Sequence, residues 1–470
     1  MSKEIKPDYT TQFLLPPSLE DWIAEDHPAR FIREFVDVLD LEAIGFRMRP
    51  EDDRGRSNYS ADLLLKVWLY GYVERIYSTR KLERACMNQM PLIWLTGNNV
   101  PDHNTLWRFF KDNQKAMKKL FRHTAKLALD AGMVGMILHA VDGTKVRARG
   151  SEEKVLDRER IDELMARIEE SVDRMVVEVD ANEGSEEGSY RMPSELASSA
   201  KLREYLLKAK ERMETEGVKY LHPGEDEARL MKCEGKVALS YNAQAVVDEK
   251  EMIIVAEEVV NEENDMHQLT FMIDAVTENL GACADETLAD NGYYASEELA
   301  KSEEKGYSVL VSLKDKYEDE FHWTNFYHDE KNDCLICPMG ARLEYAYTDR
   351  CKRLPAKVYR CLSHKDCPRR CECSSDRIGR RVKLGVYHKA MMRQKEKQRS
   401  REMKALLKKR KYLIEPIFAI IKQCMVFRRF TVFGLDNVRS QWALICTVYN
   451  LKKLYKFWQS GKPLLMPIRN

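Results

Sequence analysis

The segment from residue 235 to residue 313 limits the possible folds of this chain more than any other. It begins with two runs in which apolar and polar residues alternate, "GKVALSYNAQAVV" and "MIIVAEEVV", separated by a turn at Asp248 and Glu249. Such alternation is typical of half-buried strands. Two helical stretches then alternate with two short apolar runs: "HQLTFMIDAVTENLGA", "ETLAD", "SEELAKSEEKG" and "YSVLVSL". A hairpin followed by strand–helix alternation predicts a mixed α/β sheet.

Two aspartates end short apolar runs of this kind. Asp142 lies in "MILHAVDGTKVRARG" and Asp290 in "ETLADNGYYA", and each is followed by a glycine turn. Functional groups converge at the carboxyl ends of strands in α/β sheets. For Asp290 a second interpretation stays open, since aspartate is common in Asp-Asn-Gly turns, where it caps local backbone groups. A third acid, Glu415, precedes Pro416 on a basic helical stretch, and the proline predicts a kink or a restart of that helix there.

Two aspartates and a glutamate can hold two divalent metal ions for an in-line phosphodiester displacement. One ion activates water or a 3'-hydroxyl, and the other stabilises the leaving oxygen. Mg²⁺, or Mn²⁺ in its place, takes such hard oxygen ligands, and its charge would offset the repulsion between the acids. Lys422 lies seven residues after Glu415, close to two helical turns, so both should face the same side. Such a cation can hold a DNA phosphate, although a surface lysine in a lysine-rich segment is the simpler alternative.

The net charge of +1 hides two opposed blocks. Residues 151–230 hold 22 acidic and 13 basic side chains, for a net charge of −9. Residues 377–470 hold 24 basic and 4 acidic side chains, for a net charge of +20. A near-neutral total of this kind predicts that one surface meets a polyanion, most commonly nucleic acid. The alternative is that the basic block is a solvated helical face.

Helical patterns fill residues 60–130. Three helices joined by short turns, with basic side chains such as Arg84 and Arg108 facing outward, are compatible with a helix-turn-helix-like DNA-binding unit. Three-helix packing without DNA binding explains the same pattern. A cap candidate at Asp102 begins the last of these helices, which is predicted to run to Ala131 and Gly132.

Composition divides the chain further. Residues 150–232 are charged and helical in pattern, and residues 320–376 are rich in cysteine and poor in apolar residues, so both read as insertions. A helical N-terminal domain (1–132) then precedes an interrupted α/β domain (133–319 and 377–458). The latter ends with a long basic helix near 388–427 and an amphipathic final helix. No apolar run reaches about 18 residues and no basic start precedes an apolar stretch, so we expect a cytoplasmic protein without a membrane span or signal peptide.

Seven of the twelve cysteines fall between residues 334 and 373. In a reducing cytoplasm, clustered cysteines indicate metal ligation more than disulfides. Four thiolate or imidazole ligands can hold a structural zinc ion. The spacing does not choose among the candidates, and reduced free thiols remain the alternative. One plausible ligand set is Cys337, His364, Cys367 and Cys373.

Taken together, the motifs resemble those of DDE transposases from bacterial insertion sequences, in the group whose C-terminal signature runs Tyr, Arg, Glu, Lys. The resemblance spans nearly the whole chain, through "YSADLLLKVWLYGYVERIYSTRKLERAC", "LTGNNVPDHNTLWRFF", "AVDGTKVRA", "SYNAQAVVDEKEMIIVAEEVVNEENDMHQL", "LADNGYY", "CPMGARL", "IEPIFAIIK" and "ALICTVYNLKKL". It implies a ribonuclease H-like mixed sheet with helices on both faces, preceded by the helical N-terminal domain and interrupted by the helical and Cys-rich insertions. Related transposases often carry a similar cysteine-bearing insertion.

The resemblance also implies site residues and partners. Asp142, Asp290 and Glu415 would be the metal-binding acids, with Mg²⁺ or Mn²⁺ as cofactor, and Lys422 the signature lysine. The partners would be double-stranded DNA, meaning the terminal inverted repeats and target DNA, bound by a homodimer or larger assembly in the bacterial nucleoid. The implied activity is DNA cleavage and strand transfer. A catalytically silent DNA-binding regulator derived from a transposase is the alternative.

The sequence departs from the signature at its arginine. That position falls on Lys411 and the signature tyrosine on Lys408, and lysine lacks the bidentate phosphate geometry of arginine. A one-residue shift would bring Arg410 or Tyr412 into use instead. The candidate DNA-binding residues are Lys422, Lys145, Arg410, Lys411, Arg428, Arg84 and Arg108.

Overall fold

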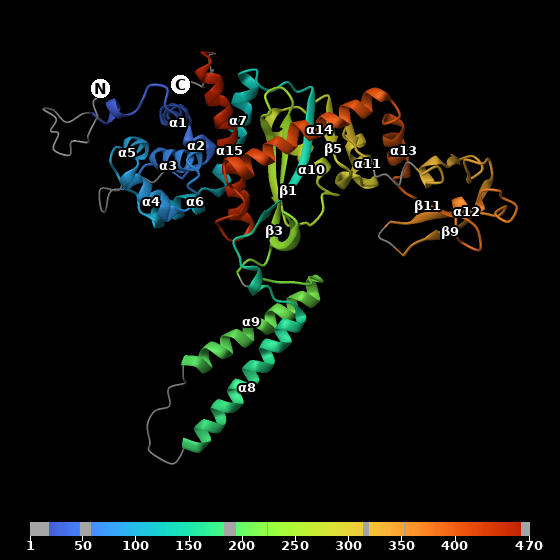
Figure 1. The fold of residues 1–470 in the computed structure, drawn as a ribbon, viewed down its shortest axis with the longest axis horizontal. Helices are drawn as coiled ribbons and strands as arrows, with labels where there is room; N and C mark the ends of the chain where they lie inside the picture. The colour runs from blue at the N-terminus through green and yellow to red at the C-terminus, as the bar shows by residue number, and fades with distance from the viewer. Residues whose placement is uncertain are drawn as a thin grey trace, which may run out of the picture.

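The computed structural model describes residues 18–47, 58–182, 194–222, 224–313, 319–351 and 354–461. Its centre is a six-stranded mixed sheet (Figure 1). The strands are β1 (Leu138–Arg147), β2 (Arg229–Cys233), β3 (Lys236–Asp248), β4 (Ile254–Val260), β5 (Glu286–Ala289) and β6 (Val309–Val311). The mixed α/β class expected from the sequence is confirmed.

The topology of this sheet is ribonuclease H-like. The path runs β2-β3-β1-β5-β6, and β4 also pairs with β3. β3 is antiparallel to β1, β2 and β4, whereas β1, β5 and β6 are parallel. Every residue of β3 from Ala238 to Asp248 is buried, because packed elements cover both faces of the sheet.

Five helices of the α/β domain pack around the sheet. They are α10 (Leu269–Leu280), α11 (Ser296–Glu304), α13 (His388–Lys397), α14 (Arg401–Ala419) and α15 (Leu435–Gln459). α14 contacts β1, β3, β5 and β6, and it crosses in front of the sheet in Figure 1. α10 and α15 pack along β4. α15 is the expected final helix, but it is buried on nearly all sides from Val438 to Leu451 rather than along one stripe.

The long basic helix expected at 388–427 is divided in the structure. α13 ends at Lys397, and α14 begins after Ser400, whose side chain accepts a hydrogen bond from the Met403 N–H at 3.0 Å. α14 continues through Pro416 without restarting, and a π-helical turn, η6 (Ile420–Cys424), follows it. The helix therefore changes its winding four residues after the proline, in the turn that carries Lys422, and such π-turns occur often at functional sites.

The N-terminal helices pack onto the same hydrophobic core as the sheet. They are η1 (Leu19–Trp22), α1 (Pro28–Asp37), α2 (Leu41–Ile44), α3 (Ala61–Val73), α4 (Thr79–Asn88), α5 (Met90–Leu95), α6 (His103–Asp112) and α7 (Gln114–Asp130). Asp102 caps α6 as predicted, accepting from the Thr105 N–H at 2.8 Å. The helix expected beyond it breaks at Asn113, because the Asn113 side chain donates to the Phe109 carbonyl and accepts from the Arg47 N–H.

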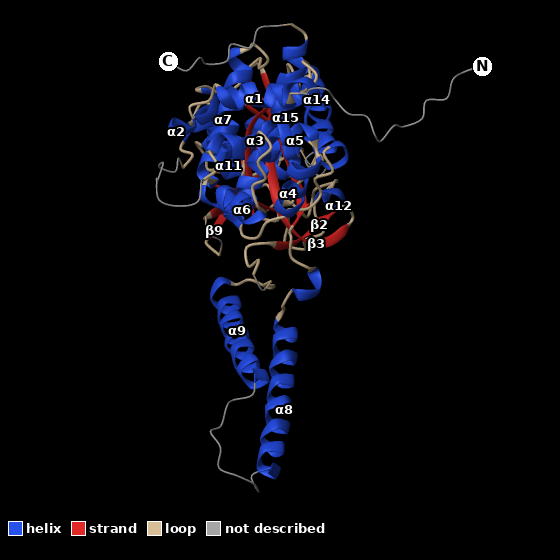
Figure 2. Ribbon diagram, turned by 90° about the vertical axis from the view of Figure 1, so that its left-hand side faces the viewer, coloured by secondary structure: helices blue, strands red, loops and turns tan. Residues whose placement is uncertain are grey.

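A helical hairpin interrupts the α/β domain between β1 and β2. After a short turn, η2 (Glu152–Lys154), it consists of α8 (Arg158–Asn182) and α9 (Ser194–Glu216), which project away from the body of the molecule (Figures 1 and 2). A small core of its own, which includes Ile161, Leu206 and Met213, holds the two helices together. Residues 183–193, between the two helices, lie outside the described residues. The last part of the expected insertion is β2, which joins the main sheet.

The Cys-rich region folds into a five-stranded antiparallel sheet, in the order β11-β10-β9-β8-β7. Its elements are η5 (Trp323–Asn325), β7 (Tyr327–Asp329), β8 (Cys334–Ile336), β9 (Arg342–Asp349), β10 (Ala356–Cys361), α12 (Arg370–Cys373) and β11 (Arg381–Gly385). Although this region has few apolar residues, Phe326, Leu335 and Tyr359 contribute to a small core of its own. β11 extends the unit past residue 376, the end expected from the sequence.

No helix in the described ranges is both long enough and apolar enough to cross a membrane.

Between the N-terminal helices and the sheet, two neighbouring glutamates of β4 have opposite environments. Glu258 forms ion pairs with Lys118 of α7 at 3.0 Å and with Arg439 of α15 at 2.9 Å. Glu257 is buried, and within the described chain its Oε2 atom has no hydrogen-bond partner. Burial, with the charge of Glu258 beside it, holds the pKa of Glu257 well above its ordinary value.

We expect Glu257→Gln to stabilise the protein at pH 8 and to have little effect at pH 5. The pKa of Glu257 is higher in the folded chain than in the unfolded one, so its contribution to stability is present at low pH and lost as pH rises between the two values. That loss amounts to about 1.4 kcal/mol per pH unit within the window. Thermal unfolding at both pH values measures the difference. Glu258→Gln is the control and should lower Tm, whereas an equal Tm shift of Glu257→Gln at both pH values would contradict the account.

Candidate functional site

The two predicted aspartates lie on neighbouring parallel strands. The register pairs Leu138 with Glu286 and Ala140 with Leu288, so Asp142 and Asp290 each lie two residues beyond the last pair. β5 ends at Ala289, so Asp290 follows its carboxyl end as predicted. β1 does not end at Asp142. It continues to Arg147, because β3 pairs with it over the whole of this length.

Asp290 caps a local turn and also lies near Asp142, so the two interpretations of its sequence do not exclude each other. It caps the short turn η3 (Asn291–Tyr293), and its Oδ1 atom accepts a hydrogen bond from the Gly292 N–H at 2.7 Å. The turn is therefore a local reason for an aspartate at this position. The same turn holds the Asp290 carboxylate at the end of β5, close enough to Asp142 to influence its charge.

The surroundings of Asp142 favour a nearby positive charge. Burial raises the pKa of Asp142 to about 6; Arg410 opposes this rise and Asp290 adds to it. Arg410 Nη1 lies 2.7 Å from Asp142 Oδ2, and the Gly143 N–H donates to Asp142 Oδ1 at 2.8 Å. A carboxylate that is both buried and beside another carboxylate needs a cation to stay ionised. In this structure the guanidinium of Arg410 meets that need.

α14 supplies Arg410 but turns Glu415 away. Arg410 is buried, whereas Glu415 and Lys411 are exposed. At about 100° per residue, Glu415 points roughly 140° away from Arg410 around the helix. Across the part of the chain that the structure describes, no three His, Cys, Asp or Glu side chains are grouped so as to hold a metal ion. The aspartates are thus adjacent, and the third predicted acid stands apart from them.

Two lysines of the predicted set meet on β1, three residues beyond Asp142. Lys422, in the π-helical turn η6, donates to the backbone carbonyl of Lys145 on β1 at 3.0 Å. The Lys145 ammonium lies 3.6 Å from the carboxylate of Asp265, and Asp142 and Asp290 also act on its charge. The structure therefore brings basic groups from two distant segments to the aspartate pair.

Asp265 belongs to this cluster and was not foreseen from the sequence. It lies in the loop between β4 and α10, and its Oδ1 atom accepts hydrogen bonds from Asn242 Nδ2 at 2.6 Å and Gln244 Nε2 at 2.7 Å. In the sequence it stands within "NEENDMHQL", where no apolar run or glycine turn singles out one acid from its neighbours. The structure shows its place in the cluster through its closeness to Gly143, because a Cβ atom added to Gly143 would lie 2.7 Å from Asp265 Oδ1.

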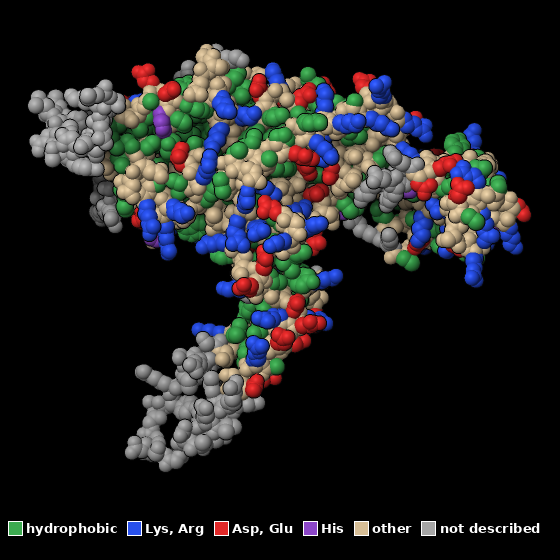
Figure 3. Space-filling view, viewed as in Figure 1, with side chains coloured by type: hydrophobic (Ala, Val, Ile, Leu, Met, Phe, Trp, Pro, Cys, Tyr) green, Lys and Arg blue, Asp and Glu red, His purple; other side chains and the backbone are tan. Residues whose placement is uncertain are grey.

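The remaining basic candidates lie on the surface. Arg428 is exposed, and its carbonyl accepts a hydrogen bond from the Arg147 N–H at the end of β1. Arg84 on α4 and Arg108 on α6 are exposed as expected. Figure 3 shows Lys and Arg side chains gathered at the end of the body from which the helical hairpin projects. The basic surface therefore extends beyond the aspartate pair.

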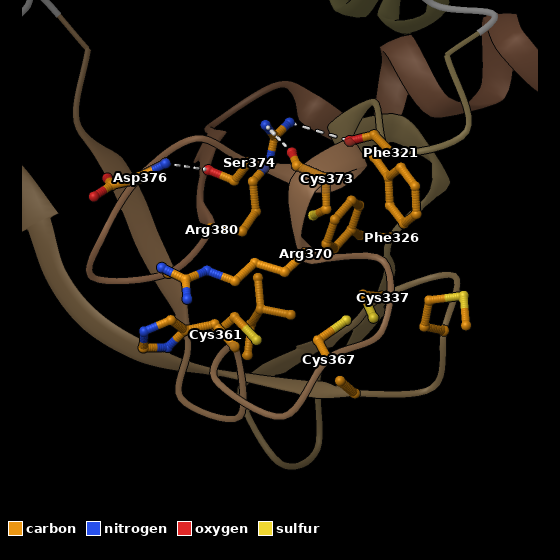
Figure 4. A pocket seen from close by; sticks show the side chains of 15 residues that line it. Phe321, Phe326, Cys337, Cys361, Cys367, Arg370, Cys373, Ser374, Asp376 and Arg380 are labelled. Carbon is orange, nitrogen blue, oxygen red and sulfur yellow. Dashed lines mark hydrogen bonds between the residues drawn. The ribbon is translucent and has the colours of Figure 1, made fainter.

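Four cysteines of the Cys-rich region line one cavity (Figure 4): Cys337, Cys361, Cys367 and Cys373. Burial raises the pKa of the Cys373 thiol; Arg380 opposes this, and Cys337, Cys367 and Cys361 add to it. His364, a predicted ligand, also lines the cavity, but its Nε2 atom lies 3.2 Å from the Arg377 carbonyl. Cys361, which the predicted set omits, joins the three predicted cysteines. None of the twelve cysteines forms a disulfide.

Two protein-family models match the chain. A transposase DDE domain matches residues 336–455, a range that contains Arg410, Glu415 and Lys422. A transposase domain designated DUF772 matches residues 17–112, the N-terminal helices up to α6. No curated protein matches the chain. Both matches name transposase domains, and between them lies the ribonuclease H-like sheet with its aspartate pair. The two family-model matches support a DDE transposase of an insertion sequence.

Proposed function

We propose that this transposase cleaves DNA at the ends of its element and joins the freed 3'-hydroxyl to target DNA, using divalent metal ions. The observation that carries the proposal is that Asp142 on β1 lies close enough to Asp290, directly after β5, for the charge of Asp290 to act on it. Carboxylates at such a strand end are suited to phosphodiester chemistry when metal ions neutralise them.

The residues at this site fit Mg²⁺ or Mn²⁺. Carboxylate oxygens are the hard ligands that both ions prefer. The raised pKa of Asp142 and its contact with Arg410 support a site that takes up positive charge. Asp142, Asp290 and Glu415 would hold two metal ions, of which one would activate the attacking oxygen and the other would stabilise the leaving one. The contribution of Glu415 requires its side chain to approach the pair in the DNA complex.

The basic residues would bind the DNA. Arg410 contacts Asp142, the charge of Lys145 lies beside both aspartates, and Lys422 binds the Lys145 carbonyl, so these three would bind phosphates near the scissile bond. The exposed residues farther away would hold the flanking duplex, namely Lys411, Arg428, Arg84 and Arg108. Phosphate contacts of this kind make affinity fall steeply with salt. Both element ends must be held together during transfer, so we propose a homodimer or larger assembly on the DNA.

Cleavage of a labelled duplex that carries the element's own ends tests this function. We expect nicked and joined products with Mg²⁺ and none with chelator. A catalytically silent regulator would instead bind the same ends tightly and yield no product with Mg²⁺ or Mn²⁺. That second outcome would overturn the enzymatic proposal.

We further propose that the Cys-rich region binds structural zinc through Cys337, Cys361, Cys367 and Cys373, the four cysteines that line the cavity. Zinc would draw the four sulfur atoms together, and we expect about one zinc ion per purified chain. Cys373→Ser should lose the zinc and lower Tm. Cys351→Ser, at an exposed position outside the cavity, is the control and should keep it. Purified wild-type protein without zinc would support reduced free thiols instead.

A further inference from the structure

Asp265 occupies the space that a missing side chain leaves on β1. The register pairs Gly143 with Gln244 and Lys145 with Asn242, so these four residues share one face of the sheet. A Cβ atom on Gly143 would lie 2.2 Å from Gln244 Nε2 and 2.7 Å from Asp265 Oδ1. Gly143 therefore lets the Asp265 carboxylate lie against the backbone of β1.

The two amides fix the position of this carboxylate. Asn242 and Gln244 are fully buried, and both donate to the same oxygen, Asp265 Oδ1. Gln244 also accepts a hydrogen bond from the Tyr293 hydroxyl, and Tyr293 lies in the turn that Asp290 caps. A buried, connected network of this kind holds its members in one arrangement. Asp265 is thus tied to the turn of Asp290 and to the strand that carries Asp142.

Asp265 faces inward from a loop that is otherwise exposed to solvent. Between Glu262 and His267, all residues except Asp265 are exposed, whereas the Asp265 side chain is only 18% exposed. Asn242 also donates to the Glu262 carbonyl, which fastens the loop to β3. An aspartate placed inward in an otherwise exposed loop costs desolvation energy that a partner must offset.

The cation nearest to Asp265 is Lys145. Its ammonium lies 3.6 Å from Asp265 Oδ1, and its side chain is 19% exposed. Within the described residues Lys145 Nζ is buried and has no hydrogen-bond partner. At this distance the carboxylate holds the buried ammonium by charge and leaves its N–H groups unpaired.

We propose that Asp265 is a positioning residue of the active site, which holds the Lys145 ammonium beside Asp142 and Asp290 so that its positive charge acts on the DNA phosphate being cleaved. This inference rests on the proposed cleavage function and deepens it. Asp265 acts through Lys145, and the two residues should behave as one unit when either is replaced.

Single-turnover cleavage of labelled element ends with Mg²⁺ tests this unit. Asp265→Asn should slow cleavage on the order of 10- to 100-fold, the loss expected when a reacting group is misplaced, while end binding and Tm stay close to wild type. Lys145→Gln should be similarly slow, and the double variant no slower than Lys145→Gln alone. Glu263→Gln, an exposed neighbour in the same loop, is the matched control and should cleave at the wild-type rate.

A second readout does not depend on cleavage. In Asp265→Asn the Lys145 amine loses its partner and should react several-fold faster with acetic anhydride, as measured by mass spectrometry. Lys208 of α9, which pairs with Glu204 far from the site, is the internal reference. Additive losses in the double variant, wild-type cleavage by Asp265→Asn, or unchanged acylation of Lys145 would overturn the inference. If the wild-type protein does not cleave, the proposed function itself is overturned. The acylation of Lys145 does not depend on cleavage, so it distinguishes failure of the inference from failure of the proposed function.

Discussion

Asp142→Asn and Asp290→Asn are each expected to slow cleavage of element ends on the order of 10³-fold or more, while end binding stays near the wild-type level. Asparagine has nearly the same shape as aspartate and keeps an acceptor for the N–H of Gly143 or Gly292, which the two aspartates bind now. It removes the negative charge that would hold a metal ion. Single-turnover cleavage and a binding assay on the same labelled duplex separate the two effects.

Asp285→Asn is the matched control for these variants. Asp285 is exposed and lies just before β5, at the end of the strand away from Asp290. Its replacement should leave cleavage unchanged. If the Asp142 and Asp290 variants lost end binding to the same degree as cleavage, their assignment to chemistry would be wrong.

Glu415→Gln separates the third acid from the pair. If Glu415 approaches the aspartates in the DNA complex, its replacement should slow cleavage as severely as theirs. Wild-type cleavage by Glu415→Gln would remove Glu415 from the site. The aspartate pair would then stand without the third acid that the family signature supplies.

Gly143→Ala is expected to be the most damaging single-methyl change at the site. The added Cβ atom would lie 2.2 Å from Gln244 Nε2 and 2.7 Å from both Asn242 Oδ1 and Asp265 Oδ1. Gln244 is buried and bonded to Tyr293 and Asp265, so it cannot move without breaking these bonds. Overpacking of this kind costs about 1–3 kcal/mol, and cleavage should fall on the order of 100-fold because the network shifts.

Thermal unfolding and single-turnover cleavage measure both effects of Gly143→Ala. Gly385, on β11 of the Cys-rich region, is the control, because a Cβ atom built there meets nothing within 4 Å. Gly385→Ala should leave Tm and cleavage close to wild type. Normal cleavage by Gly143→Ala would show that the polar network does not support the site.

Local patterns were enough to predict much of this fold. The alternation in "GKVALSYNAQAVV" and "MIIVAEEVV" gives β3 and β4, and the apolar run before Asp290 gives β5, whereas the glycine turn expected after Asp142 does not form because β1 continues to Arg147. Both signals depend on residues adjacent in the sequence. The break of the helix at Asn113 could not be predicted this way, because the Arg47 N–H that binds its side chain lies far away in the chain.

The rest of the site depends on packing. The sequence left open whether Arg410 or Lys411 serves the site, because the rotation of α14 is set by what it packs against. In the structure Arg410 faces Asp142. Asp265 was missed because its role comes from two amides on β3 and from the gap at Gly143. Such groups meet only when the sheet forms.

The most direct test of the aspartate pair as a metal-bearing catalytic site is a change of metal preference. Asp290→Cys replaces a hard carboxylate ligand with a softer thiolate, which binds Mn²⁺ better than Mg²⁺. Single-turnover cleavage of element ends should then be lost with Mg²⁺ and partly restored with Mn²⁺, whereas Asp290→Asn stays inactive with both. Cleavage by Asp290→Cys at the wild-type rate with Mg²⁺, or at one equal rate with either ion, would contradict metal binding by Asp290.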